Sequence, residues 1–278
     1  GAARLCLQKA ALPQEKVQLA LAGDLQAQCT ASSYAMRELG VPFAGLFGAC
    51  STMAEGLALG AALCEGGAAR NLLAMASSHF CAAERQFRTP LSYGAVRTPT
   101  AQWTATAAGC CLLQPQGEGV GIAAATFGRV QDYQVKDINN MGAAMAPAAA
   151  STLLHYFKDT GTEPQEFDCI YTGDLGQVGS QLLRELLAAE GLLIKNHVDC
   201  GCILFDANEQ SVKSGGSGPG CCAAVLCGHI LPRLRRGSQK RVLFTATGAL
   251  MSQTTFLQKE SIPAVAHLVE LRAPEKEK

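Results

Sequence analysis

The chain has 278 residues, 48% of them hydrophobic and 17% charged, which is enough to bury a sizeable core in one large domain or in two halves of ordinary size. Its 23 basic and 23 acidic residues cancel, and a net charge of zero argues against a nucleic-acid-binding surface. The 13 cysteines include no C-x2-C pair and lie mostly in apolar segments, so we expect reduced core thiols of an intracellular protein rather than zinc ligands or disulfides. The sequence has no run of 18 apolar residues that predicts a membrane-spanning helix.

The first part of the chain alternates between helical and strand patterns. We expect helices at residues 2–11, 28–39 and 50–67, strands at 17–22, 43–47, 71–76, 102–113 and 120–127, and a loop at 80–100. Gly40 ends the second helix, and Gly66 and Gly67 end the third, because glycine readily adopts the conformation that follows a helix. Alternation of this kind predicts a mostly parallel sheet covered by helices.

The second part of the chain repeats the pattern of the first. Helices are expected at residues 140–157 and 220–237, and strands at 167–172 and 241–247. Short matching sequences recur in the same order: PQE at 13 and 164, GDL at 23 and 173, and REL at 37 and 184. Together with the matching elements around them, these repeats predict an internal duplication, with an N-terminal half at 1–116 and a C-terminal half at 117–278.

The stretch around Cys50 combines a short strand, a tight turn and a helix. Cys50, Ser51 and Thr52 stand where the helix begins, so we expect their hydroxyls to cap free backbone N–H groups, and Glu55 to lie at the positive end of the helix dipole. A cysteine at the start of a buried helix can have a lowered pKa and act as a nucleophile. A small apolar side chain that fills a tight turn gives the same pattern, so both interpretations stay open.

Several chemically active side chains follow expected strands. They are Asp24, Cys50, His79 and Asp174, and the two hydroxyls of Ser77 and Ser78 precede His79. Ligands of parallel α/β sheets bind beyond the carboxyl ends of the strands. The sequence therefore predicts a cleft at this end of the sheets.

Six segments resemble motifs of the stage V sporulation protein AD family, which has a thiolase-like fold. They are residues 48–52 (GACST), 100–104 (TAQWT), 140–149 (NMGAAMAPAA), 217–221 (SGPGC), 247–252 (TGALMS) and 261–267 (SIPAVAH). The resemblance covers the whole chain and implies an α/β fold of two duplicated βαβα-type halves, layered αβαβα. It also implies that the N-terminus of the family is missing, including a first strand that we expect at the centre of the first sheet.

By this resemblance, the chain has the cysteine of thiolases and ketoacyl synthases but lacks the residues that handle protons beside it. In those enzymes a histidine and an asparagine hydrogen-bond the acyl oxygen and direct proton transfer. In ketoacyl synthase III-like relatives these two residues stand where this chain has residues 171–175 (YTGDL) and 217–220 (SGPG). The remaining histidines are expected in other places, with His155 and His229 in helices and His197 and His267 beside strands. This pattern points away from catalysis.

What the resemblance implies is a non-enzymatic protein that binds dipicolinic acid (pyridine-2,6-dicarboxylate). It implies work with membrane proteins of the same sporulation transport complex, a peripheral place at the forespore or spore inner membrane, and a homodimer. We expect no cofactor and no protein-held metal, with calcium arriving together with the ligand. The expected ligand-binding residues are Cys50, Ser51, Ser77, Ser78, His79, Met141 and Asp174.

Two alternatives remain open from the sequence. One is a Cys50-dependent acyltransferase or condensing enzyme, and the other is a structural subunit whose cleft is vestigial. Arg88 or Arg97 offers charge for a carboxylate ligand, although a solvated loop arginine fits equally well. Trp103 and Tyr93 offer rings that stack on a pyridine, although core packing suits Trp103 better.

Overall fold

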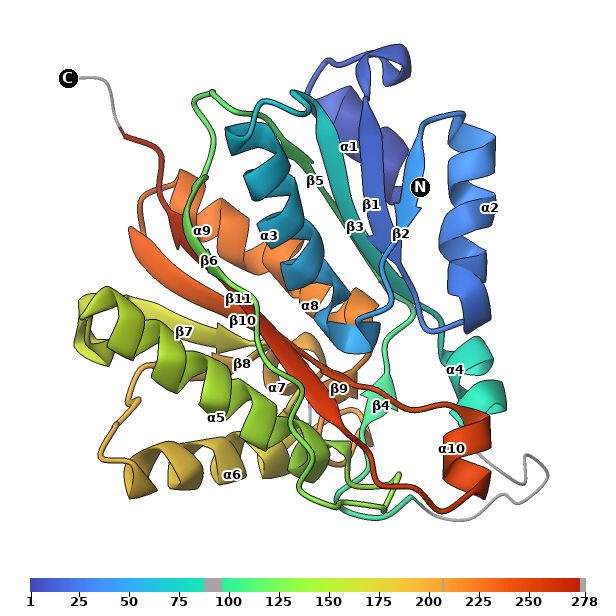
Figure 1. The fold of residues 1–278 in the computed structure, drawn as a ribbon, viewed down its shortest axis with the longest axis vertical. Helices are drawn as coiled ribbons and strands as arrows, with labels where there is room; N and C mark the ends of the chain where they lie inside the picture. The colour runs from blue at the N-terminus through green and yellow to red at the C-terminus, as the bar shows by residue number, and fades with distance from the viewer. Residues whose placement is uncertain (88–96, 207, 276–278) are drawn as a thin grey trace.

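The computed structural model describes residues 1–87, 97–206 and 208–275, which fold as five layers, with helices outside and between two sheets (Figure 1). The first sheet has the order β2-β1-β3-β5, with β5 antiparallel to the other strands. Its strands are β1 (Leu19–Gly23), β2 (Phe43–Gly45), β3 (Leu72–Ser78) and β5 (Ala107–Leu113). The layers and strand types are those of the thiolase-like α/β fold expected from the sequence.

The second sheet has the order β6-β11-β10-β7-β8, with β7, β8 and β10 parallel. Its strands are β6 (Gly121–Thr126), β7 (Cys169–Thr172), β8 (His197–Asp199), β10 (Arg241–Ala249) and β11 (Ala264–Arg272). Strand β11 is antiparallel to both of its neighbours. Four strands of this sheet, in the order β8-β7-β10-β11, repeat the arrangement of the first sheet.

The expected gap at the centre of the first sheet is wrong. Strand β1 pairs directly with β3 from Leu19↔Leu72 to Gly23↔Ala76, so nothing is missing between them. The second sheet explains why, because its first strand in the chain, β6, lies at the edge beyond β11. By the same arrangement, a counterpart of β6 would lie beyond β5 at the edge of the first sheet. The expectation failed because order along the chain does not fix order in a sheet.

The central layer is made by α3 and by the helical run that starts with α8. The helices and helical turns of the described residues are α1 (Ala2–Lys9), η1 (Gln14–Lys16), η2 (Ala27–Cys29), α2 (Thr30–Leu39), η3 (Ala49–Ser51), α3 (Thr52–Glu65), α4 (Phe80–Phe87), α5 (Met141–Thr160), η4 (Pro164–Glu166), α6 (Gly176–Ala189), α7 (Cys200–Leu204), α8 (Pro219–Val225), η5 (Leu226–Ile230), α9 (Leu231–Arg235) and α10 (Gln253–Leu257). Helices α1 and α2 cover the outer face of the first sheet, and α5 and α6 cover that of the second.

Strand alternation directs side chains to different layers. Along β10, Val242 and Phe244 pack against the central helices, whereas Leu243 packs under α5 and α6. Along β3, Ala74 and Ala76 face the central layer, and Leu73 faces α1 and α2. The central helices are therefore buried from both sides, which suits the small residues that the sequence places on them.

Two expectations from the sequence need correction in the segment after β3. The expected loop at 80–100 begins with helix α4, and its residues 88–96 lie outside the described part of the chain. The expected strand 102–113 is divided into β5 and the short β4 (Trp103–Thr104), which pairs with β9 (Gly216–Ser217) of the other half. It is interrupted at Ala105, whose N–H donates to Ser217 and whose carbonyl accepts from Ser78.

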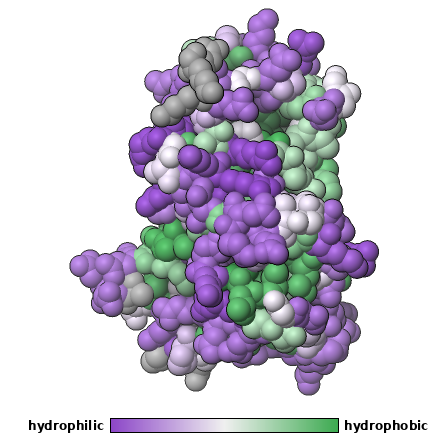
Figure 2. All heavy atoms as spheres, turned by 90° about the vertical axis from the view of Figure 1, so that its left-hand side faces the viewer, coloured by the Kyte–Doolittle hydropathy of each residue, from purple (hydrophilic) through white to green (hydrophobic). Residues whose placement is uncertain are grey.

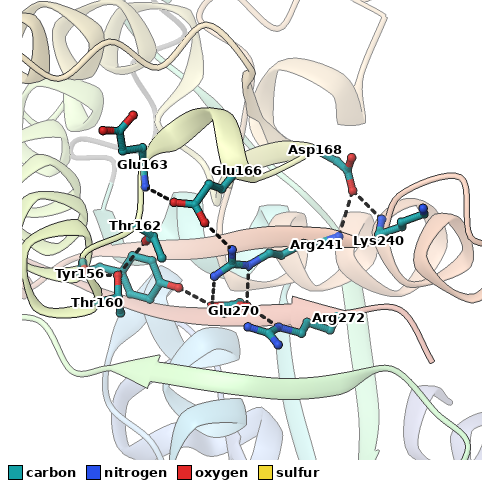
Figure 3. Close-up of polar contacts among 10 residues, drawn as sticks. All are labelled: Tyr156, Thr160, Thr162, Glu163, Glu166, Asp168, Lys240, Arg241, Glu270 and Arg272. Carbon is teal, nitrogen blue, oxygen red and sulfur yellow. Dashed lines mark hydrogen bonds and ion pairs between the residues drawn. The ribbon is translucent and has the colours of Figure 1, made fainter. Parts of the chain in front are cut away.

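A buried ion-pair network holds β10 and β11 to α5 (Figure 3). The carboxylate of Glu270 accepts from both Nε and Nη2 of Arg241, at 2.8 and 3.2 Å, from the Tyr156 hydroxyl at 2.5 Å and from Arg272 Nε at 2.6 Å. Burial alone would raise the pKa of Glu270, but the hydrogen bonds from Arg241, Tyr156 and Arg272 lower it to about 2. Because Arg241 and Arg272 begin and end the two strands, this network secures the end of the sheet opposite Asp174.

Candidate functional site

Cys50 lies in the single turn η3 between β2 and α3, as the sequence predicts. The turn is tight, since Ala49 has a φ of 50°, and β10 passes so close that a Cβ at Gly248 would stand 2.0 Å from the Gly48 carbonyl oxygen. The side chain of Cys50 is buried, with 8% of its surface exposed. A glycine at 248 is therefore what lets the second half close over the cysteine turn.

The carboxyl group next to Cys50 belongs to Asp174, which follows β7. It is fully buried and accepts from the Gly218 N–H at 2.9 Å, the Ser217 hydroxyl at 3.1 Å and the Thr247 hydroxyl at 3.4 Å. The Cys50 thiol lies beside the same carboxyl, and each group shifts the pKa of the other. Burial raises the pKa of Asp174 to about 7 against the opposing effect of these hydrogen bonds.

The environment of Cys50 keeps its thiol protonated. Burial, followed by the neighbouring Asp174 carboxylate, raises the pKa of Cys50 well above the ordinary value of a cysteine. The N–H of Gly218 acts in the opposite direction but is outweighed. Since the thiolate is the nucleophilic form, the arrangement opposes covalent catalysis at this sulfur.

A second buried carboxylate, Asp199 at the end of β8, organises the loops around the site. It accepts from the N–H groups of Leu175 and Gly176, both at 2.9 Å, from Cys202 N–H at 3.2 Å, and from the Thr172 hydroxyl at 2.6 Å. Burial raises the pKa of Asp199 to about 6. Asp174 and Asp199 together fix the chain segments that begin α6, α7 and α8.

His197, the first residue of β8, belongs to the same hydrogen-bonded network as Asp199. His197 in β8 has Nε2 at 2.8 Å from the Thr172 hydroxyl, and burial lowers its pKa to about 4. It is therefore neutral and bonded to the scaffold of Asp199. His155 and His229 lie in α5 and η5 as expected, whereas His197 and His267 lie inside β8 and β11 rather than beside strands.

The hydroxyls at the start of α3 do not cap its N–H groups, which corrects the expectation from the sequence. Ser51 and Thr52 instead donate backwards, to the carbonyls of Gly48 and Ala49, both at 2.7 Å. Glu55, in the first turn of α3, lies against Gly48, and its buried Oε2 has no hydrogen-bond partner among the described residues. The two hydroxyls hold the cysteine turn in shape, and Ser51 is completely buried.

The structure separates the two serines at the end of β3. Ser78 points into the central layer, where its hydroxyl donates to Ala105 at 2.7 Å and accepts from Gly220 N–H at 3.1 Å. Ser77 is half-buried on the opposite face of the sheet, because successive side chains of a strand alternate. Ser78 thus ties β3 to the start of α8, and only Ser78 of the pair is on the side of Cys50.

Of the remaining expected residues, His79 is exposed just before α4, and Met141 is half-buried at the start of α5, where it packs against the core beneath that helix. Trp103 stacks on Phe80 with ring centroids 4.5 Å apart. Arg97 lies 4.6 Å from the centre of the Trp103 ring and donates to the Gln102 carbonyl, so it is not a solvated loop arginine. Arg88 and Tyr93 lie outside the described residues.

Gln102 was not expected at the site from the sequence, yet it connects the two halves of the molecule. Its Nε2 donates to the carbonyls of Asp174 at 2.6 Å and Gly216 at 2.9 Å, while its buried Oε1 has no protein partner. Thr247 was missed as well. Neither position has a local signal, although both fall inside motifs, TAQWT and TGALMS, that carry the family resemblance.

The described residues contain no group of three or more His, Cys, Asp or Glu side chains arranged to hold a metal ion. The same ranges contain no helix whose length and apolar character would let it span a membrane.

Known proteins resemble this chain both in sequence and in fold. The family model for Stage V sporulation protein AD (SpoVAD) matches residues 1–272. The chain belongs to the stage V sporulation protein AD family. The stage V sporulation protein AD of Bacillus subtilis (strain 168) is 43% identical over 267 residues, which cover 96% of this chain and 79% of the relative.

Solved structures similar to this member of the family include condensing enzymes. A 3-oxoacyl-[acyl-carrier-protein] synthase III from Aquifex aeolicus VF5 has a TM-score of 0.59 at 14% identity, covering 98% of this chain and 82% of the other. A variant of OleA from Xanthomonas campestris has a TM-score of 0.64 at 14% identity, covering 98% of this chain and 79% of the other. At such low identity the likeness establishes the thiolase-like fold and nothing about activity.

Proposed function

We propose that this protein is a non-enzymatic binding protein for dipicolinate, or its calcium complex, acting in sporulation. The observation that carries the proposal is the Asp174 carboxyl beside Cys50. A condensing enzyme needs a group that lowers the thiol pKa, whereas Asp174 raises the pKa of Cys50. Membership of a sporulation family supports a role outside fatty-acid chemistry.

The runner-up is a condensing enzyme or acyltransferase that uses Cys50. It is favoured by the retained cysteine turn and by the condensing enzymes among proteins of the same fold. It requires Cys50 to become a thiolate against burial and the charge of Asp174. Turnover of acetyl-CoA or acetoacetyl-CoA that disappears in Cys50→Ala would replace our proposal with this one.

Electrostatics restricts the form in which a dianionic ligand can bind. Asp174 lies in a low-dielectric environment, where a second negative charge nearby is costly. Two forms avoid this cost: the neutral calcium complex of dipicolinate, and the dianion bound together with a proton on Asp174. We place the ligand at the rim of the Cys50 turn, beside Met141 and His79, because the hydroxyls of Ser51 and Ser78 already have protein partners.

Calorimetric titration of the full-length protein with dipicolinate, with and without calcium, tests the proposal. Pyridine-2-carboxylate, which has one carboxylate, is the matched control ligand. We expect dipicolinate to bind more tightly than the control, and calcium to strengthen its binding. Equal, negligible heats for both ligands in both conditions would leave a structural subunit with a vestigial cleft as the better account.

We further propose an isologous homodimer formed through β2. This strand is the edge of the first sheet and is flanked by Phe47 and Tyr34, which are 66% and 58% exposed. An unpaired apolar edge is a liability that pairing with a second copy removes. Phe47→Asp should shift sedimentation towards the monomer. Leu257→Asp, at a residue 71% exposed on α10, is the control and should leave it unchanged.

Membrane proteins of the same sporulation complex are the partners we propose, with this protein bound peripherally. The side of the molecule seen in Figure 2 carries hydrophobic patches divided by hydrophilic side chains. That mixture does not mark one docking surface, so the contact is best mapped by crosslinking in sporulating cells. Recovery of no membrane protein, with the protein floating free of spore membranes, would contradict the proposal.

A further inference from the structure

A pair of thiols, Cys111 on β5 and Cys227 on η5, lies apart from Cys50, where β5 meets η5. Cys110, the neighbour of Cys111, and Cys6 on α1 pack on the opposite, outer face of the first sheet. The sulfurs of Cys111 and Cys227 are 3.9 Å apart, and the Cys227 sulfur is 3.7 Å from the Cys110 carbonyl oxygen. All four cysteines are free and half-buried.

The contact between Cys111 and Cys227 joins distant parts of the chain. The two residues are 116 positions apart, one in the first sheet and the other in the central layer. Cys227 belongs to a π-helical turn of five residues inserted between α8 and α9. Such turns are uncommon and often occur at functional sites, because the extra residue redirects a side chain. Here the turn carries the thiol that meets β5.

The surroundings of Cys111 and Cys227 shift the pKa values of the two thiols in opposite directions. The hydrogen bond from Cys111 lowers the pKa of Cys227, with help from the backbone of Cys110 and the charge of Arg235 and against the effect of burial. The pKa of Cys111 is raised well above its ordinary value by the same hydrogen bond and by burial. The positive charge of Arg235 favours Cys227 as the attacking thiolate, with Cys111 as the thiol that resolves the product.

We propose that Cys111 and Cys227 form a reversible disulfide with a low-molecular-weight disulfide as the oxidant. The Cys227 thiolate attacks the oxidant, forms a mixed disulfide and releases one small thiolate, which takes a proton. Cys111 then loses its proton and attacks the Cys227 sulfur, which releases the second small thiol. Two protein thiols are oxidised and one small disulfide is reduced to two thiols, so the electrons balance.

The bond would tie the first sheet to the central layer. A crosslink that closes a long loop restricts the unfolded chain more than the folded protein. We therefore expect oxidation to raise the melting temperature by on the order of 10 °C, and a reductant to reverse the change.

The test treats the full-length protein with oxidised glutathione at neutral pH, alkylates the remaining thiols and maps the cysteines by mass spectrometry. We expect one peptide pair joined through Cys111 and Cys227. Cys111→Ser should instead retain one glutathione on Cys227, because the resolving thiol is gone. Cys81→Ser, which removes an exposed thiol on α4, is the control and should leave the crosslink intact.

Other results would overturn the proposal. They are a Cys227 that stays free and alkylatable while Cys81 is glutathionylated, and a Cys227 joined to Cys6 or Cys110 in place of Cys111. Loss of the crosslink in the Cys81→Ser control would likewise count against it.

Discussion

The Cys50 thiol lies beside the buried carboxyl of Asp174, a residue that follows β7 in the other half of the molecule, and each group shifts the pKa of the other. This proximity opposes formation of the Cys50 thiolate. A carboxylate raises the pKa of a neighbouring thiol, whereas a protonated imidazole or a helix N-terminus lowers it. The raised pKa thus keeps the Cys50 thiol in its protonated form, which is not the nucleophilic one.

Removing the Asp174 charge should make Cys50 more reactive. In Asp174→Asn the pKa of Cys50 falls, because the neighbouring negative charge is gone, and alkylation by iodoacetamide becomes faster at a given pH. Mass spectrometry of the Cys50 peptide across a pH series measures this. Asp199→Asn is the matched control, since it removes an equally buried carboxylate that has no bond to Cys50. Equal alkylation rates in both variants and the parent would contradict the assigned role.

The two buried aspartates should make the protein more stable in mild acid than at slightly alkaline pH. Their folded pKa values, about 7 for Asp174 and about 6 for Asp199, exceed that of an unfolded aspartate, so the folded state binds protons more tightly. The unfolding free energy therefore falls as pH rises from about 4 through about 7, by on the order of 2–4 kcal/mol for Asp174 alone. Urea unfolding at several pH values measures the slope. A slope that is unchanged in Asp174→Asn would argue against this origin.

Glu270 should have the opposite effect at low pH. Its folded pKa of about 2 is below that of an unfolded glutamate. The stability that the ionised Glu270 contributes is therefore present above about pH 4.3 and is lost as pH falls through about 2. Stability should accordingly pass through a maximum in mild acid.

Glu270→Gln should destabilise the fold by about 3–5 kcal/mol, because it leaves Arg241 without its buried partner. Glu166→Gln is the matched control. It removes the other carboxylate that contacts Arg241. Because the Glu166 side chain is 45% exposed, the loss of unfolding free energy should be at most about 1 kcal/mol. Chemical unfolding of both variants measures the difference. Similar losses for the two would show that burial does not set the strength of this network.

Dipicolinate binding should strengthen as pH falls from about 8 to about 6, since Asp174 then takes up a proton and its charge no longer opposes the ligand. The pH dependence should be weaker in Asp174→Asn and weaker for the calcium complex. Titrations at both pH values, each with parent and variant, provide the comparison. A tighter complex at the higher pH would point to a site away from Asp174.

Much of the fold could be predicted because it depends on local patterns. Gly40 ends α2 with a φ of 66°, and the turn at Gly48 and Ala49 leads into the helix as expected. The short repeated sequences also fall at equivalent positions of the two sheets. Each of these features is set by residues close together in the chain.

What could not be predicted depends on pairing between distant residues. Strand β1 pairs directly with β3, although β2 lies between them in the chain. The expected central gap was therefore wrong. Ser77 and Ser78 looked equivalent in the sequence, but strand alternation sends them to opposite faces. The bond of Gly218 to Asp174 joins residues 44 positions apart and has no sequence signature.

The most direct test of the central claim compares dipicolinate binding to the parent and to Cys50→Trp by calorimetry. The indole would fill the cysteine turn and its rim, whereas Cys81→Trp adds the same ring on α4 as a control. If Cys50→Trp has lost its cooperative melting transition, the smaller Cys50→Met takes its place. We predict binding to the parent and the control and none to the folded Cys50 variant. Parent-like affinity in a folded Cys50 variant would contradict the claim that the cysteine turn is the ligand site.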